Sequence, residues 1–74
     1  MNILELIASV LQMNAADLEE DDGTETIAAW DSMKILMIAS MIEISYDLTL
    51  DNSDIEELGT VRAVRAVLSR HGRG

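Results

Sequence analysis

The residue types and spacings that catalysis or metal binding would need can be tested first. Hydrolysis by a serine nucleophile needs a positioned base, and His71, the single histidine, lies near the end of the chain with nothing in the sequence to orient it toward a serine. A calcium loop of the EF-hand type needs a glycine at its sixth position and oxygen ligands at its first and twelfth. Placing Gly23 at the sixth position puts Leu18 and Ala29 at those ligand positions. The sequence therefore predicts a protein that is not an enzyme and holds no metal.

Ser32 offers a different chemistry, the attachment of a group to its hydroxyl. It follows Asp31, a good N-cap residue, at the start of a strongly patterned helix. The backbone N–H groups of a first helical turn are unpaired and carry partial positive charge. A phosphate on the Ser32 hydroxyl would be well placed there, although a local capping role accounts for the same serine more simply.

Apolar spacing and capping residues predict an all-α fold, a single domain of four helices. We expect helices over residues 2–13, 32–46, 54–58 and 60–71. An acidic loop over residues 14–30 joins the first two, and a connection this long is often functional. Two apolar residues are expected to hold this loop on the core: Leu18 and Ile27.

The helix ends are predicted from residues that satisfy free backbone groups. Asn2 and Glu5 form a capping box for the first helix, Ser53 and Glu56 form one for the third, and Thr60 caps the fourth. Two glycines are expected to end the third and fourth helices: Gly59 and Gly72.

The helix over residues 32–46 carries two apolar stripes at about 100° per residue. One is the predicted core face: Ile35, Ile38, Ala39, Ile42 and Tyr46. The other lies more than a right angle away: Met33, Met37, Met41 and Ile44. A surface helix normally has one apolar face. The second stripe is therefore either covered by the long loop or free to meet another molecule.

The charge distribution limits the classes of partner that the protein can bind, and the apolar runs indicate its location. The chain has 74 residues, a net charge of −9, no cysteine and no proline. Fourteen acids against a single lysine give residues 1–61 a charge of −13, and four arginines give residues 62–74 a charge of +4. Such an acidic body repels nucleic acid and attracts basic proteins. No apolar run is long enough for a membrane span and the first residues lack a basic signal region, so we expect a cytoplasmic protein.

Three short stretches, taken together, resemble the acyl carrier protein family. They are Trp30-Asp31-Ser32-Met33, then Ile42-Glu43-Ile44-Ser45-Tyr46-Asp47-Leu48-Thr49-Leu50, and finally Thr60-Val61. They are similar to the Asp-Ser-Leu that opens the family's second helix, the apolar-Glu-aromatic end of that helix, and the Thr-Val that opens the last helix. The length, the acidity and the long first loop agree, so the resemblance covers nearly the whole chain.

The resemblance implies a four-helix acyl-carrier-like bundle with a 4′-phosphopantetheine arm joined to Ser32 through a phosphodiester. A separate phosphopantetheinyl transferase would attach the arm, and the thiol at its end would hold cargo as a thioester. Ser32 would be an attachment point, and Asp31 would place it before the transferase. The lack of cysteine fits, because the reactive sulfur would come with the cofactor.

The chain also departs from the family pattern. Position 33 is Met where Leu is usual, which also looks like the D-alanyl carriers of cell-wall modification. Fatty-acid carriers have acidic residues on the exposed side of the second helix, where this chain has Lys34, Met37 and Ile44. We therefore expect a more apolar and selective docking face, formed by Asp31, Met33, Leu36, Met37, Ser40, Glu43 and Ile44.

The sequence thus favours a discrete, monomeric acyl carrier of a specialised pathway, such as a polyketide-like one, that visits cargo-loading and cargo-processing enzymes. An aminoacyl or peptidyl carrier, including the D-alanyl type, is the first alternative. A cofactor-free acidic module that binds a basic protein is the second.

Overall fold

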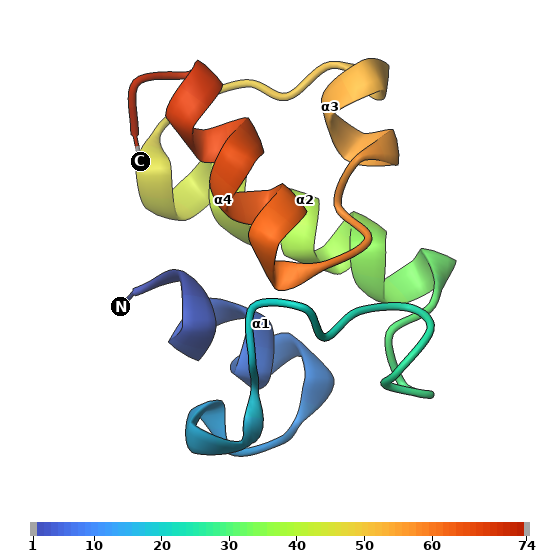
Figure 1. Cartoon of the computed structure of the whole chain (residues 1–74). Coiled ribbons are helices and arrows are strands. Elements are labelled where there is room, and N and C mark those ends of the chain that lie inside the picture. Colours follow the sequence, from blue (N-terminus) through green and yellow to red (C-terminus); the bar gives the residue numbers. More distant parts are fainter. Residues whose placement is uncertain (1, 74) are drawn as a thin grey trace.

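Four α-helices and no strand make up the regular structure of residues 2–73, the part of the chain that the computed structural model describes. The helices are α1 (Ile3–Leu11), α2 (Ser32–Tyr46), α3 (Asn52–Glu56) and α4 (Val61–Arg70), and a short 3-10 turn, η1 (Ala15–Asp17), follows α1. The all-α prediction is therefore confirmed. In Figure 1, α4 crosses over α2, α1 lies below both, and both ends of the described chain lie on one side.

The core lies between α1, α2 and α4, because each presents one continuous apolar face to the others. Leu6 and Ile7 of α1, Ile38 of α2, and Val64 and Val67 of α4 are fully buried. Side chains that contact each other in this way each contribute roughly 1.5–3 kcal/mol when removed from water. The short helix α3 packs against α2 and supplies a single buried side chain, a carboxylate that is described below.

The predicted caps hold at three helices. Asn2 and Glu5 form the capping box of α1, Asp31 accepts from the backbone N–H of α2, and Thr60 accepts from that of α4. The first helix ends at Leu11, two residues before the predicted 13, because Gln12 adopts a left-handed backbone with φ of 58° and closes the helix. The fourth helix ends at Arg70, one residue early.

The prediction for the third helix was wrong at both ends. α3 begins at Asn52, because Asp51 is its cap and forms a capping box with Asp54. The predicted cap, Ser53, is instead an exposed residue inside the helix. The helix also ends at Glu56, before the predicted residue 58.

Candidate functional site

The first turn of α2 presents the Ser32 hydroxyl to solvent. Ser32 is the first residue of the helix and is exposed. Asp31 Oδ1 accepts a hydrogen bond from Lys34 N at 3.0 Å, and Asp31 O accepts one from Ile35 N at 2.9 Å. The Ser32 hydroxyl makes no hydrogen bond within residues 2–73. A group on this oxygen would lie at the partly positive end of the helix, beside the free N–H groups of the first turn.

Trp30 fixes the chain two residues before Ser32. Its side chain is 1% exposed, and its indole Nε1–H donates to Leu58 O at 3.1 Å. Leu58, itself fully buried, lies in the connection between α3 and α4. The start of α2 is therefore held against a segment that is 28 residues further along the chain. The residues around Trp30 in the sequence do not indicate this anchoring role, because Leu58 is remote along the chain.

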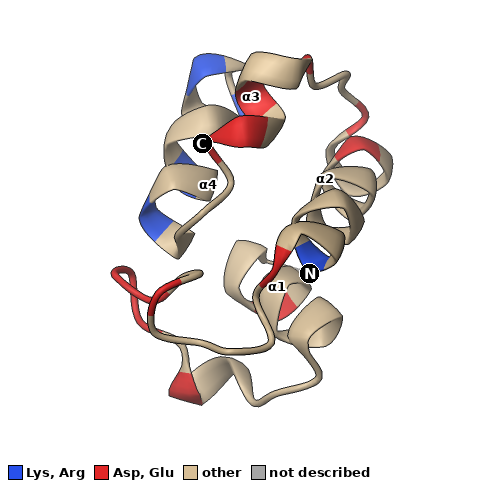
Figure 2. Ribbon diagram, turned by 90° about the vertical axis from the view of Figure 1, so that its right-hand side faces the viewer, with Lys and Arg blue, Asp and Glu red and all other residues tan. Residues whose placement is uncertain are grey.

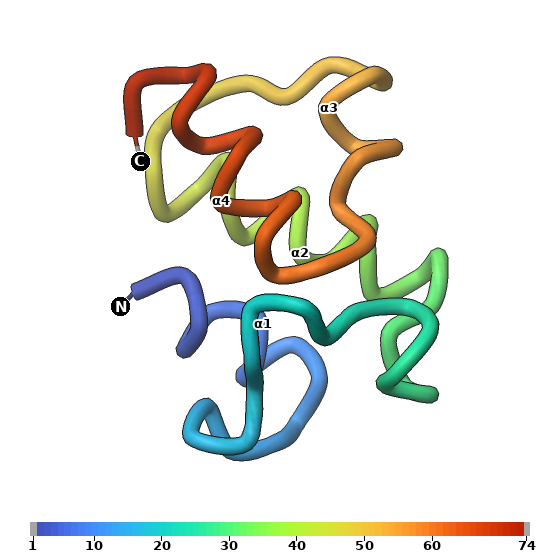
Figure 3. Tube along the Cα trace, in the orientation of Figure 1, coloured from blue at the N-terminus to red at the C-terminus, as the bar shows by residue number. Residues whose placement is uncertain are grey.

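The acidic loop is fastened to the start of α4 by its backbone. Val61 N donates to Asp22 O at 3.0 Å and Arg62 N donates to Glu20 O at 2.9 Å, so two free donors of the α4 N-terminus are satisfied by loop carbonyls. Figure 3 shows the loop passing beneath the start of α4 before it turns to α2. The loop therefore reaches α2 along a fixed path.

Gly23 permits this contact because the two backbones meet at its Cα. A Cβ at position 23 would lie 2.0 Å from Gly59 O and 2.9 Å from Thr60 Cα, closer than real Cβ atoms come. Thr24 N donates to the same Gly59 O at 3.0 Å. No local pattern in the sequence indicates this requirement, because Gly23 and Thr60 are far apart along the chain.

Ion pairs reinforce the fastening of the loop. Arg62 lies 2.9 Å from Asp21 and Arg65 lies 2.8 Å from Glu20. Figure 2 shows the basic side of α4 near the acidic loop. The Asp21 carboxylate raises the pKa of the Arg62 guanidinium above its usual value. Each pair is exposed and thus contributes little on its own, but together they neutralise part of the loop's charge.

The outer side of α2 carries a cluster of exposed apolar side chains, which we call the α2 apolar face. Its members are Met33, Leu36, Met37 and Ile44, exposed by 64%, 54%, 44% and 78%. The long loop does not cover them. An open depression of about 310 Å³ lies within this face, lined by Leu36, Met37, Ser40 and Met41. The second stripe is thus mostly exposed, with Met41 half-buried against the core.

The predicted core face and the polar docking residues fall in three environments. Ile38, Ala39 and Ile42 are buried, while Ile35 and Tyr46 are half-buried against the core. Asp31 and Ser40 are exposed. Glu43 is half-buried, and its Oε2 accepts from Leu50 N at 2.9 Å. One oxygen of the Glu43 carboxylate is therefore used to hold Leu50, in the segment after α2.

A buried carboxylate on α3 holds the last residues of α4. The Asp54 side chain is 10% exposed; His71 Nε2 lies 2.8 Å from its Oδ2 and Arg70 Nη2 donates to its Oδ1. The hydrogen bond with His71, and then those with Asp51 N and Arg70, lower the pKa of Asp54 against the opposing effect of burial. Arg70 also bonds Glu57 at 2.9 Å. His71 is thus oriented by the Asp54 carboxylate, and no serine hydroxyl bonds it within residues 2–73.

Residues 2–73 contain neither a cluster of potential metal ligands nor a membrane-spanning helix. This part of the chain contains no group of three or more His, Cys, Asp or Glu side chains that could hold a metal ion. None of its helices has the length and apolar character needed to cross a membrane.

Comparison with known proteins adds no assignment. No protein-family model matches the sequence, and no characterised protein matches it significantly.

Proposed function

We propose that this protein is an acyl carrier of the acyl carrier protein type. Ser32 would bear a 4′-phosphopantetheine arm, attached by a phosphopantetheinyl transferase, whose thiol holds acyl intermediates as thioesters. The observation that carries the proposal is the exposed, unbonded Ser32 hydroxyl at the first position of α2. The four helices and the long first loop support this proposal, since an acyl-carrier bundle would have the same elements in the same order.

The surroundings of Ser32 fit a phosphodiester. The free N–H groups of the first turn favour negative charge at this end of α2. The neighbouring Asp31 carboxylate already accepts from Lys34 N, and so directs one oxygen into the helix cap. The hydrogen bond of Trp30 to Leu58 O limits the movement of the start of α2, which a transferase must bind. Ser32 acts here as an attachment point, and the transferase supplies the catalytic groups.

The α2 apolar face beside Ser32 supports docking of partner enzymes mainly through apolar contacts, with ion pairs contributing less. Burying one Met or Ile at an interface contributes roughly 1.5–3 kcal/mol, whereas an exposed ion pair contributes below about 1 kcal/mol. Asp31 and Lys34 at one end would add orientation. We therefore propose dedicated partners, the cargo-loading and cargo-processing enzymes of one specialised pathway, such as a polyketide-like one, acting on a monomeric cytoplasmic carrier.

Mass spectrometry tests the attachment directly. Incubation of the full chain with coenzyme A and a broad-specificity phosphopantetheinyl transferase should add one phosphopantetheine. The Ser32→Ala variant should stay unmodified, and Ser45→Ala, which removes an exposed hydroxyl near the other end of the same helix, should be modified normally. An unmodified wild-type chain, or a modified Ser32→Ala chain, would refute the carrier assignment.

Two alternative functions are each favoured by specific residues. The Asp31-Ser32-Met33 sequence is also similar to that of aminoacyl carriers of the D-alanyl type, and loading by an adenylating enzyme would favour an aminoacyl or peptidyl carrier. The exposed α2 apolar face, together with the net charge of −9, also suits a cofactor-free module that binds a basic partner protein. Partner binding that is equal in wild type and Ser32→Ala, without any cofactor on either, would favour that module.

A further inference from the structure

Three of the five methionines of the chain lie in α2, and they follow one another at intervals of one helical turn. Met33 and Met37 belong to the α2 apolar face and are exposed by 64% and 44%, whereas Met41 is half-buried against the core. Met37 and Met41 also line the open depression of about 310 Å³ on this face. Two thioether side chains are thus presented to solvent, one turn apart, within a single apolar surface.

Met33 and Met37 are the most accessible oxidisable side chains of residues 2–73. Cysteine, whose thiolate is oxidised readily, is absent from the sequence. Trp30, the single tryptophan, is only 1% exposed, and Met13 is half-buried against the core. Because oxidation of a side chain depends on its accessibility to the oxidant, a soluble oxidant should react at the α2 apolar face first.

Oxidation would change the polarity of this face and leave the fold in place. A methionine sulfoxide is polar, and its oxygen would have to be buried without a donor when an apolar partner covers it. The core side of α2 is formed by other residues, such as Ile38 and Ile42, which are completely buried. One added oxygen on each exposed thioether would therefore remove apolar contact area without disturbing the packing of the helices.

We propose that Met33 and Met37 form a reversible oxidation site that converts the α2 apolar face from apolar to polar. With hydrogen peroxide as the oxidant, an S–O bond forms at each thioether while the peroxide O–O bond breaks. The sulfur loses two electrons, and the peroxide is reduced to water. A methionine sulfoxide reductase restores the thioether, with two thiols oxidised to a disulfide and the oxygen released as water. The consequence for partner enzymes, weaker docking, rests on the proposed function, whereas the modification itself does not.

Peptide mass mapping of the full chain tests which sulfurs react. After addition of hydrogen peroxide, we expect Met33 and Met37 to gain one oxygen each several times faster than Met13 and Met41. The unfolding midpoint, followed by circular dichroism, should stay unchanged at this stage, and a methionine sulfoxide reductase with dithiothreitol should restore the original masses. Equal rates at all four positions, an oxidised chain that unfolds, or sulfoxides that the reductase leaves in place would overturn the proposal.

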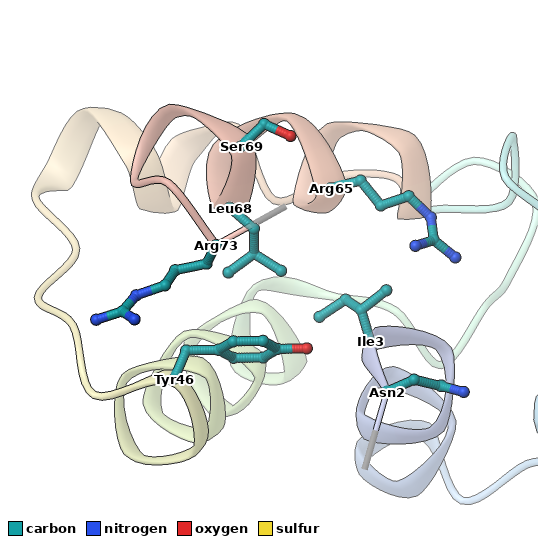
Figure 4. Close-up of a pocket in the computed structure, with 7 residues that line it drawn as sticks. All are labelled: Asn2, Ile3, Tyr46, Arg65, Leu68, Ser69 and Arg73. Carbon is teal, nitrogen blue, oxygen red and sulfur yellow. The ribbon is translucent and has the colours of Figure 1, made fainter.

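Nile red tests the change in polarity, because this apolar dye is neutral and is not repelled by the net charge of −9. We expect the dye to shift the ¹H–¹⁵N signals of Leu36 and Met37, and its affinity to fall roughly tenfold or more after oxidation. Figure 4 shows a cavity at the other end of α2, and none of the described residues that line it is a methionine. Absent binding, shifts centred on Leu68 and Ser69 of that cavity, or an affinity that oxidation leaves unaltered would overturn the proposal.

Matched variants assign the effect to the two exposed sulfurs. In the double variant Met33→Leu with Met37→Leu, the apolar volume is kept and the sulfur is removed, so peroxide treatment should no longer weaken dye binding. In Met13→Leu, which removes a sulfur outside the α2 apolar face, peroxide should weaken it as in wild type. A double variant that still loses affinity after peroxide would refute the assignment. Attachment of phosphopantetheine is measured separately on the unoxidised chain, so failure of the carrier proposal and failure of the oxidation site give different results.

Discussion

Replacing Gly23 with alanine should separate the acidic loop from α4. The new Cβ would lie 2.0 Å from Gly59 O, and both atoms belong to backbones that other contacts hold. The segments must therefore move apart by more than an ångström, which breaks or lengthens three hydrogen bonds: Thr24 N to Gly59 O, Val61 N to Asp22 O, and Arg62 N to Glu20 O. At roughly 0.5–1.5 kcal/mol each, the free energy of unfolding should fall by about 2–4 kcal/mol.

This loss is a large fraction of the whole, because a chain of this size has a total stability of about 4–11 kcal/mol. Urea unfolding, followed by the fluorescence of Trp30, the single tryptophan, measures it directly. Gly59→Ala is the matched control on the opposite side of the same contact: a Cβ there meets no atom within 4 Å, and the stability should change by less than about 1 kcal/mol. If Gly23→Ala loses less than about 1 kcal/mol, or if both variants lose equally, the steric reasoning is wrong.

Three further predictions concern the anchor, the buried carboxylate and the docking face. Trp30→Phe leaves the buried Leu58 carbonyl without its donor and should cost about 1–3 kcal/mol in urea unfolding, followed by circular dichroism because this variant lacks the single tryptophan; a variant as stable as wild type would contradict the anchoring role. Asp54 has a lowered pKa, so the folded state favours its ionised form; its stabilisation should be complete above the ordinary aspartate pKa of about 3.9 and be lost as the pH falls through the lower folded value. The unfolding midpoints of wild type and Asp54→Asn should therefore converge toward acid, and a constant difference between them would refute this. Met37→Glu should weaken cargo transfer by the cognate enzyme by roughly ten- to a hundredfold, with unfolding unchanged because the side chain is 44% exposed; unaltered turnover would exclude apolar docking.

The sequence predicts well those elements whose signals are local. The pattern of α2 correctly gave Ile38 and Ile42 as core residues, and Asp31 and Thr60 as caps, because each depends on neighbours within about two helical turns. The exposure of Ser32 also follows from its place at a helix start. Whether Met33 and Met37 are covered depends on the path of the acidic loop, which the apolar periodicity of α2 does not predict.

The errors arise where two local signals compete or where the partner is remote. Near α3, a box of Ser53 with Glu56 and one of Asp51 with Asp54 are both consistent with the sequence. The structure selects the earlier box, in which Asp54 is also held by Arg70, the last residue of α4, and by His71, which follows it. That tertiary contact, like the one made by Gly23, joins segments that no short pattern links.

The attachment of the loop carbonyls to the first amides of α4 has a consequence for local opening. Val61 N–H and Arg62 N–H lose their acceptors only when the loop lifts away, and the same loop ends at the buried Trp30. These protons should therefore exchange with deuterium in step with the indole proton, as parts of one cooperative unit. The chain would then have no separately melting lid over its core on this side, and the turn that bears Ser32 would persist until the molecule opens as a whole.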